Sequence, residues 1–230
     1  MASYIFTLGF HEDFIIRRLM NSKTSKGERI IVFTVSPVSG ASEKAFKNLE
    51  AFCATAGLSR PELVEIKVSG REFIEIVYDI ISVLKDLEEP IIADLSGGMR
   101  ILVIATYIGV EMSRKRSIVY VAQESGQGEE YKIDIEEIRI LSKEYSEEKM
   151  RILKEIAENP GTTIREIAEK IKRSEKTVTT HINDLKKDRL IASKGRTQNL
   201  YITKLGEIKN KIEKHRKTIT PTEISENIEK

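Results

Sequence analysis

The sequence of 230 residues predicts an α/β fold, a mostly parallel sheet followed by a smaller and mainly helical domain. Over residues 1–134, short apolar runs with the length of buried strands alternate with amphipathic helices, which is typical of a parallel sheet covered by helices. Beyond residue 145 the apolar residues recur with helical spacing. Hydrophobic residues make up 40% of the chain and charged residues 32%, enough for a packed core and a well-solvated surface.

The first domain is predicted to span 1–134, with strands at apolar runs and helices where apolar residues recur every three or four positions. The expected strands are 4–8, 30–35, 63–68, 90–93, 117–123 and 131–134, with a turn at 125–128. The expected helices are 12–21, 42–56, 72–87 and a fourth from 101 to about Arg116. The third of these helices is expected to bury Phe73, Ile76, Val77, Ile80 and Leu84.

Three loops are expected to meet at one edge of this sheet. If the strand order is 3-2-1-4-5, the sheet is Rossmann-like and the chain reverses direction between the first and fourth strands, where such sheets bind ligands. The residues expected to bind a ligand there are Thr7, Leu8, Gly9, Phe10 and His11, then Ser36, Pro37, Val38, Ser39 and Gly40, and finally Ser96, Gly97, Gly98, Met99 and Arg100. These hydroxyls, glycines, one aromatic ring and one arginine suit a nucleotide, with Phe10 stacked on a base and Arg100 on phosphate.

The stretch 94–100 has the sequence Asp-Leu-Ser-Gly-Gly-Met-Arg and joins a buried strand to a buried helix. A helix start presents unpaired N–H groups and the positive end of the helix dipole, and glycine lets a ligand approach the backbone. A cation in that turn is unfavourable to the helix itself, so we expect Arg100 to face an anion, above all phosphate. In the competing interpretation, Gly97 and Gly98 form only a tight turn and Arg100 is solvated. The stretch lacks the P-loop ending and the dinucleotide fingerprint, so it does not indicate hydrolysis of a nucleoside triphosphate.

The second domain is predicted at 146–217 and has the element order of a winged helix-turn-helix. Ser146 is expected to cap its first helix, Thr163 and Glu166 to form a capping box, and Ser174 to cap its third helix. Short strands at 190–193 and 200–202 would flank a basic turn, and a last helix would run from Thr203 through Leu205, Ile208 and Ile212. A connecting segment, 135–145, contains neither Gly nor Pro and is expected to be ordered, whereas the tail, 218–230, is expected to be disordered.

Positive charge is concentrated in this second domain, which favours double-stranded DNA as its partner. Residues 170–217 contain 15 basic and 5 acidic residues, whereas residues 1–143 carry a net charge of −3. The third helix would enter the major groove, with Glu175, Lys176, Thr179 and Thr180 as candidates for base contacts. The candidates for phosphate contacts are Arg173, Lys186, Lys187, Lys194 and Arg196. A winged helix that serves only protein contacts is the alternative.

The cysteine and histidine content and the apolar runs argue against a disulfide-bonded, zinc-binding, secreted or membrane-spanning protein. With Cys53 as its one cysteine the chain has no intrachain disulfide, and its three histidines lack the spacing of a zinc site. The N-terminus does not have the pattern of a signal peptide, and the apolar run 101–110 is too short to span a membrane, so we expect a cytoplasmic protein. No metal, cofactor or catalytic residue is expected.

The two domains together resemble the archaeal CRISPR-associated transcription regulators of the Csa3-like family, which join a CARF sensor domain to a winged helix. The resemblance is carried by the loops after the first and second strands, by the 94–100 stretch, by Ser113-Arg114-Lys115-Arg116 and by Ser174-Glu175-Lys176-Thr177. It implies a homodimer whose two CARF domains bind a cyclic oligoadenylate, the tetramer in particular, across their twofold axis, and which regulates CRISPR-associated genes. Through the last motif it also adds Ser174 and Thr177 to the candidate DNA-binding residues.

Two other functions stay open at the level of sequence. Some CARF domains slowly cut their ring ligand, so the chain could be a cyclic oligoadenylate phosphodiesterase. It could also be a repressor that senses an ordinary metabolite or mononucleotide. The predicted loops contain no histidine or carboxylate pair with acid–base spacing, apart from His11 at their edge, which favours binding over catalysis.

Overall fold

The computed structural model describes residues 1–38, 40–123, 129–195 and 199–218, and the chain divides into two compact units, Met1–Ile138 and Arg139–Lys230. Among the described residues, no helix combines the length and the apolar character needed to cross a membrane.

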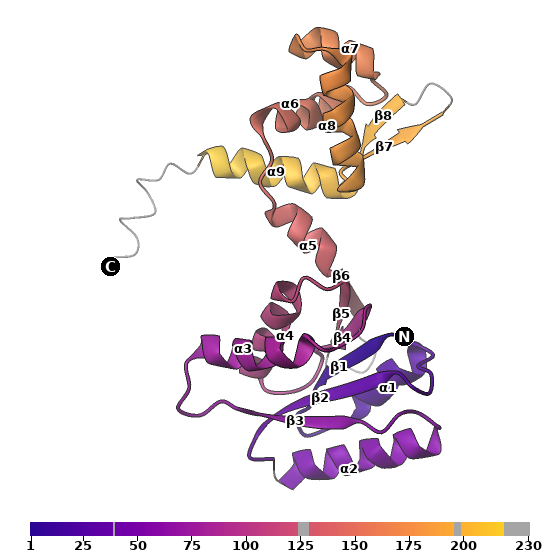
Figure 1. The fold of residues 1–230 in the computed structure, drawn as a ribbon, viewed down its shortest axis with the longest axis vertical. Coiled ribbons are helices and arrows are strands. Elements are labelled where there is room, and N and C mark those ends of the chain that lie inside the picture. The colour runs from indigo at the N-terminus through magenta and orange to yellow at the C-terminus, as the bar shows by residue number, and fades with distance from the viewer. Residues whose placement is uncertain (39, 124–128, 196–198, 219–230) are drawn as a thin grey trace. The chain divides into compact units, whose positions relative to one another are not determined.

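The first unit is a sheet with helices on both faces (Figure 1). Its strands are β1 (Ser3–Thr7), β2 (Arg29–Ser36), β3 (Glu62–Lys67), β4 (Ile91–Asp94), β5 (Ser117–Ala122) and β6 (Glu130–Asp134). Its helices are α1 (Asp13–Asn21), α2 (Gly40–Thr55), α3 (Phe73–Leu84) and α4 (Arg100–Met112). The strand order is β3-β2-β1-β4-β5-β6, with β6 antiparallel to β5 and every other pair parallel. The predicted fold class and the reversal between β1 and β4 are therefore confirmed.

Two hydrophobic cores lie on the two faces of this sheet. Because successive strand residues point to opposite faces, Tyr4 and Phe6 pack with α1 and α2, whereas Ile5 packs with α3 and α4. The buried face of α3 is Ile76, Val77, Ile80 and Leu84, as predicted. The prediction for Phe73 is wrong: its side chain is 37% exposed, because Phe73 is the first residue of α3 and is preceded by loop residues and not by a further helical turn.

The second unit contains α6 (Glu147–Glu158), α7 (Ile164–Ile171), α8 (Glu175–Lys187), the hairpin β7 (Ile191–Lys194) and β8 (Asn199–Ile202), and α9 (Lys204–Thr218). Its core joins α6, α7 and α8 through side chains that include Leu153, Ile167 and Val178. The predicted caps are confirmed: the Ser146 hydroxyl accepts from Lys149 N, the Ser174 hydroxyl from Thr177 N, and Thr163 and Glu166 form a capping box. This is the helix-turn-helix with a hairpin that the sequence predicts.

The structure departs from the sequence expectation at two places. The connecting segment, expected to be ordered but not assigned to an element, contains helix α5 (Ile135–Ser142), which crosses the boundary between the two units. In α9 the spacing of Leu205, Ile208 and Ile212 predicts one apolar face, but Ile208 is 38% exposed while the neighbouring Lys209 is fully buried. The predicted disordered tail lies outside the described residues, except Thr218, which ends α9.

Candidate ligand site and candidate DNA-binding surface

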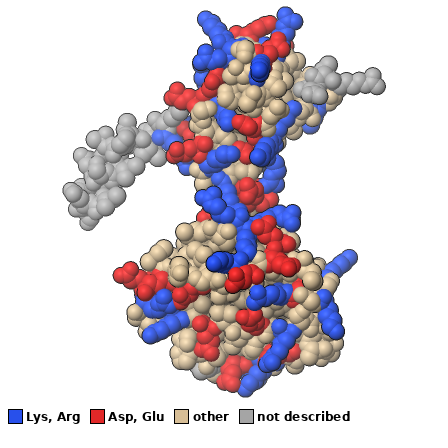
Figure 2. Space-filling view, in the orientation of Figure 1, with Lys and Arg blue, Asp and Glu red and all other residues tan. Residues whose placement is uncertain are grey.

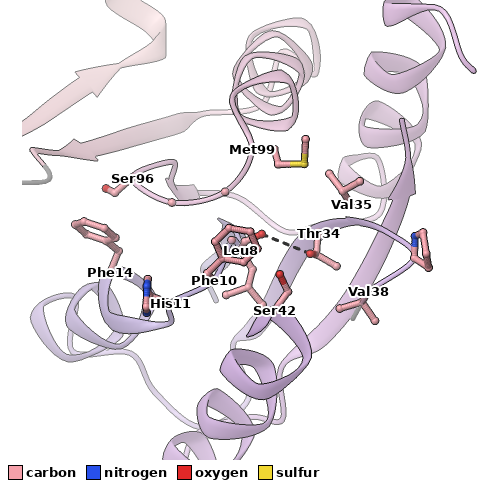
Figure 3. Close-up of a pocket in the computed structure, with 14 residues that line it drawn as sticks. Leu8, Phe10, His11, Phe14, Thr34, Val35, Val38, Ser42, Ser96 and Met99 are labelled. Carbon is pink, nitrogen blue, oxygen red and sulfur yellow. Dashed lines mark hydrogen bonds between the residues drawn. The ribbon is translucent and has the colours of Figure 1, made fainter. Parts of the chain in front are cut away.

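A cavity of about 520 Å³ opens where β1, β2 and β4 end, at the point where the chain reverses direction (Figure 3). Its lining comes from the three loops, from the end of β2 and from the first turns of α1 and α2. The lining residues are Leu8, Gly9, Phe10, His11, Phe14, Thr34, Val35, Pro37, Val38, Ser42, Ser96, Gly97, Gly98 and Met99. The topology thus brings together the loops that the sequence singles out.

The predicted ligand residues do not all line this cavity. Thr7, Ser36, Gly40 and Arg100 lie outside its lining, and Ser39 lies outside the described residues. The structure adds four residues that the sequence prediction missed: Phe14, Thr34, Val35 and Ser42. Each of them lies within three residues of a predicted loop, but strand or helix periodicity assigns it to an element. The signal that would have found them is the short distance in sequence to a strand end at the switch point.

The cavity wall is mainly apolar and carries no lysine or arginine among the described residues. Its polar side chains are His11, Thr34, Ser42 and Ser96. Phe10 and Met99 are 69% and 54% exposed, so large apolar surfaces face solvent at this site. Such a wall suits a flat or apolar group more than a bare anion.

Arg100 is the first residue of α4 and is exposed. Its guanidinium makes no hydrogen bond or ion pair with the described residues. Arg100, the one cation among the predicted ligand residues, is therefore available to a ligand. The N-cap residue Met99 provides no side-chain cap either. The helix start therefore leaves its backbone N–H groups without a side-chain partner there, which is the arrangement that favours an anion.

The glycines of the fourth loop let it pack directly against the first loop. The Thr7 hydroxyl donates to the Gly97 carbonyl over 2.5 Å, and a Cβ on Gly98 would lie 2.9 Å from the Cβ of Thr7. Gly98 also has a φ of +94°, a conformation that disfavours other residues. A Cβ on Gly9 would lie 3.2 Å from the nitrogen of Gly98. The predicted tight turn is thus half of a two-loop contact, and this packing alone accounts for glycine at 98.

Asp94, which begins the motif, is buried and serves to position the loop. One carboxylate oxygen accepts from Arg18 Nε at 3.0 Å; the other accepts from Ser96 N at 3.0 Å and from the Ser96 hydroxyl. The Ser96 hydroxyl in turn accepts from Ala122 N at 2.8 Å, which ties the loop to β5.

Arg18 of α1 completes the hydrogen-bond network around Asp94. Its guanidinium is buried, lies 3.7 Å from the ring centroid of Tyr120, and also pairs with Glu130 of β6. The sequence prediction gave Arg18, Tyr120 and Glu130 no role, since nothing in their spacing links the three elements.

The recognition helix of the second unit is α8, and it turns its apolar residues inward as predicted. Val178, Ile182 and Leu185 are buried. On the outer side Glu175, Lys176 and Thr180 are exposed and Thr179 is half-buried. The hydroxyls of Thr179 and Thr180 donate to the carbonyls of Glu175 and Lys176, at 2.7 and 3.1 Å, so they remain free to accept hydrogen bonds.

The predicted phosphate contacts are spread over this unit, on which Figure 2 shows basic side chains interspersed with acidic ones. Lys187 is exposed, Lys186 is half-buried, and Lys194 lies 5.3 Å from the ring centroid of Tyr201. Arg196 lies outside the described residues. Ser174 and Thr177 hydrogen-bond to one another at the start of α8, so their observed contacts are those of a helix cap.

Arg173 is already paired within the unit. Its Nε donates to Glu148 of α6 at 2.5 Å, and His181 Nε2 lies 3.5 Å from the other oxygen of that carboxylate. The hydrogen bond from Arg173 is the largest cause that holds the pKa of Glu148 below its ordinary value. The predicted phosphate contact of Arg173 would therefore require this guanidinium to leave Glu148.

No group of three or more His, Cys, Asp or Glu side chains in the described ranges is placed to hold a metal ion. Fold and site together define a class: a Rossmann-like domain with a pocket at the switch point of its sheet, followed by a winged helix-turn-helix domain.

Comparison with protein families narrows this class. Residues 2–135 match the Csa3 CRISPR-associated Rossmann-like domain, and residues 149–192 match a winged helix-turn-helix DNA-binding domain. A CRISPR locus-related putative DNA-binding protein, Csa3 of Saccharolobus solfataricus, is 32% identical over 206 residues, which are 90% of this chain and 86% of the relative. The chain belongs to the Csa3 family.

Solved structures with some likeness are more distant. Can2 of Sulfobacillus thermosulfidooxidans, solved in complex with cyclic tetra-adenylate, is 12% identical with a TM-score of 0.41 and covers 91% of this chain and 64% of its own. Csm6 of Enterococcus italicus, bound to cyclic hexa-2'-fluoro-hexa-dAMP, is 13% identical with a TM-score of 0.45 and covers 83% and 56%.

Proposed function

We propose that this protein is a DNA-binding transcription regulator of CRISPR-associated genes whose DNA affinity responds to a cyclic oligoadenylate, cyclic tetra-adenylate in particular. The observation that carries the proposal is the cavity at the reversal between β1 and β4 in a domain of the Csa3 family. Its apolar wall suits adenine bases. The exposed Arg100 at the start of α4 suits a phosphate of the ring.

A homodimer is part of this proposal. The first unit exposes large apolar side chains on two adjacent helices, namely Ile74 and Tyr78 on α3 and Ile104 and Met112 on α4, each more than 50% exposed. Exposed apolar surface of this kind marks protein–protein contacts. A ring of repeating units can share the twofold axis of an isologous dimer, so each protomer would bind half of the ring.

DNA binding rests on the winged helix. The outer side of α8 presents acceptors and methyl groups that can contact base edges, and the unit carries an excess of basic residues that suits phosphates. The related Csa3 of Saccharolobus solfataricus is named for putative DNA binding.

Binding is favoured over cleavage of the ring. Among the described residues, His11 is the one titratable side chain in the wall of the cavity. A single histidine without a partner base or carboxylate supplies little general acid–base catalysis. A ring nuclease is therefore the second candidate, and a sensor of a mononucleotide or other metabolite is the third.

The decisive experiment titrates the protein with a duplex that it selects from a random pool, with and without cyclic tetra-adenylate. A change in DNA affinity supports the proposal. Calorimetry with cyclic tetra-adenylate, AMP and ATP separates a cyclic ligand from a mononucleotide, and chromatography of the ring after long incubation detects cleavage. Binding of DNA that is the same with and without the ring would contradict the proposed response.

A further inference from the structure

A cluster in the second unit attaches the end of α5 to the recognition helix. Asp188 is the C-cap residue of α8 and is largely buried. One of its oxygens accepts from the Tyr145 hydroxyl at 2.7 Å and from the Lys143 ammonium at 2.6 Å. Lys143 and Tyr145 directly follow α5, so the segment that leaves this helix is hydrogen-bonded to the end of α8.

Lys209 of α9 holds the same segment from another side. Its side chain is fully buried, and its ammonium donates to the carbonyls of Leu141 and Lys143 at 3.0 and 2.6 Å and to Glu213 at 2.8 Å. Carbonyls at the C-terminus of a helix carry partial negative charge, so a cation there stabilises the end of α5. We call these five residues, Lys143, Tyr145, Asp188, Lys209 and Glu213, the connector clamp.

The aromatic ring of Tyr145 joins the two halves of the connector clamp. The ammonium groups of Lys143 and Lys209 lie 5.2 and 5.3 Å from its centroid, which is within the range of cation–π attraction. Burial, and next the hydrogen bond to Asp188, raise the pKa of Tyr145 above its ordinary value. A lysine is rarely buried, and here it has three oxygen partners and one ring.

The buried charges of the connector clamp are not required to hold the core of the second unit together. The packing of α6, α7 and α8 is already supplied by apolar side chains. Replacing a buried charge network with apolar residues is often neutral or stabilising, so such a network is better explained by the geometry that it specifies. The geometry specified here is that of the last turn of α5 against the end of α8 and against α9.

We propose that the connector clamp transmits the ligand signal from α5 to the recognition helix α8, with Tyr145 and Lys209 as positioning residues. The inference rests on the proposed function, because it requires that a ligand of the first unit changes DNA affinity. A movement of the end of α5 would shift Asp188 through Tyr145 and Lys143. Because Asp188 caps the C-terminus of α8, this shift would turn the recognition helix as a whole, including the candidate base contacts near its N-terminus.

The test uses the full chain and compares wild type with Tyr145→Phe, Lys209→Met and the control Lys211→Met. Lys211 lies on α9, is exposed and is outside the clamp, so its loss matches the charge change of Lys209→Met on DNA. For each protein we measure the DNA affinity with and without cyclic tetra-adenylate; their ratio is the coupling factor. Calorimetry gives the affinity for the ring alone, and thermal unfolding verifies the fold.

A coupling factor in wild type of the usual size, roughly 5–150, is expected to fall at least about threefold in Tyr145→Phe and Lys209→Met but not in Lys211→Met. The affinity for the ring itself should not change. If Lys209→Met does not fold, Tyr145→Phe, which removes a single hydroxyl, decides. Wild-type coupling in a folded Tyr145→Phe would overturn the inference and leave the proposed function standing. A coupling factor of one in wild type would instead overturn the proposed function, and the inference with it.

Discussion

Arg100 and Asp94, six residues apart in one motif, have different tasks. Asp94 is buried and uses its carboxylate to hold Arg18 and Ser96. Arg100 is exposed at the start of α4, and its guanidinium has no partner within the described chain. A residue that supports the fold and one that is available to a ligand can thus follow each other in a single motif.

Arg100→Ala should weaken the binding of cyclic tetra-adenylate about tenfold or more, because a charge-assisted hydrogen bond contributes roughly 1.5–3 kcal/mol. The melting temperature should stay unchanged, since no contact within the described chain is lost. Calorimetry on the variant measures the affinity. An unchanged affinity in the folded variant would remove Arg100 from the site.

Glu148→Gln should strengthen binding to every duplex, because it releases Arg173 for phosphate and removes a negative charge beside α8. Fluorescence anisotropy with two unrelated duplexes measures the effect. Glu155, also on α6, pairs with Lys170 of α7, so Glu155→Gln removes a comparable charge without releasing Arg173. An equal gain in both variants would contradict the role assigned to Arg173.

The same carboxylate has a consequence for acid stability. The pKa of Glu148 is lowered by folding, so its stabilising contribution is present above its ordinary value of 4.5 and is lost as the pH falls through the folded value. In Glu148→Gln the urea midpoint should therefore drop less between about pH 6 and about pH 3 than in wild type.

At the scale of elements, the candidate ligand site and the candidate DNA surface are built from different kinds of structure. The ends of β1, β2 and β4 form the cavity, and α8 with the hairpin β7–β8 forms the candidate DNA surface. Helix α8 carries its apolar residues on the inner side and its polar ones on the outer side. Substitutions on the hairpin should therefore change the overall DNA affinity, whereas substitutions on the outer side of α8 should change the sequence preference.

Lys194→Ala on β7 should weaken all duplexes about equally and reduce the salt slope of log affinity by about 0.9, the value expected for one phosphate contact. Thr180→Ala on α8 should instead change the order of preferred sequences. Selection from a random pool and a salt titration of both variants check these expectations. A DNA affinity that does not depend on salt would favour a winged helix that contacts protein only.

At the scale of the whole molecule, the two units are joined through α5, and each end of this helix belongs to a core. Ile135 is part of the core of the first unit and Ile140 of the core of the second. The proposed coupling of ligand binding to DNA binding would therefore run along the chain through this helix. By linkage, DNA must then change the affinity for the ring by the same factor as the ring changes the affinity for DNA.

Replacing 136–139, which lie between the buried Ile135 and Ile140, with a Gly/Ser segment should lower both coupling factors while leaving each separate affinity nearly unchanged, because a flexible chain does not transmit orientation. Both factors are measured under one salt condition, DNA affinity by anisotropy and ring affinity by calorimetry. Full coupling in this variant would mean that the signal bypasses α5.

The sequence by itself determined the kind and order of the elements other than α5, the capped helix starts and the three loops at the reversal of the sheet. These features follow from local patterns: the spacing of apolar residues, a capping serine or threonine, and glycine after a strand. The predicted roles of the site residues in binding remain predictions. Sequence analysis does not find the neighbouring Phe14, Thr34, Val35 and Ser42, because periodicity assigns each residue to an element and not to a cavity wall.

Only the tertiary structure decided which side chains are covered and which partners they meet. Asp94 meets Arg18 across 76 residues of sequence, and Lys209 is buried although Ile208 beside it has the apolar side chain. Periodicity is a property of one segment, whereas burial depends on the element that packs against it. For Lys209 that element is the end of α5, whose carbonyls require a donor, so a charged residue occupies the interior where the sequence pattern predicts an apolar one.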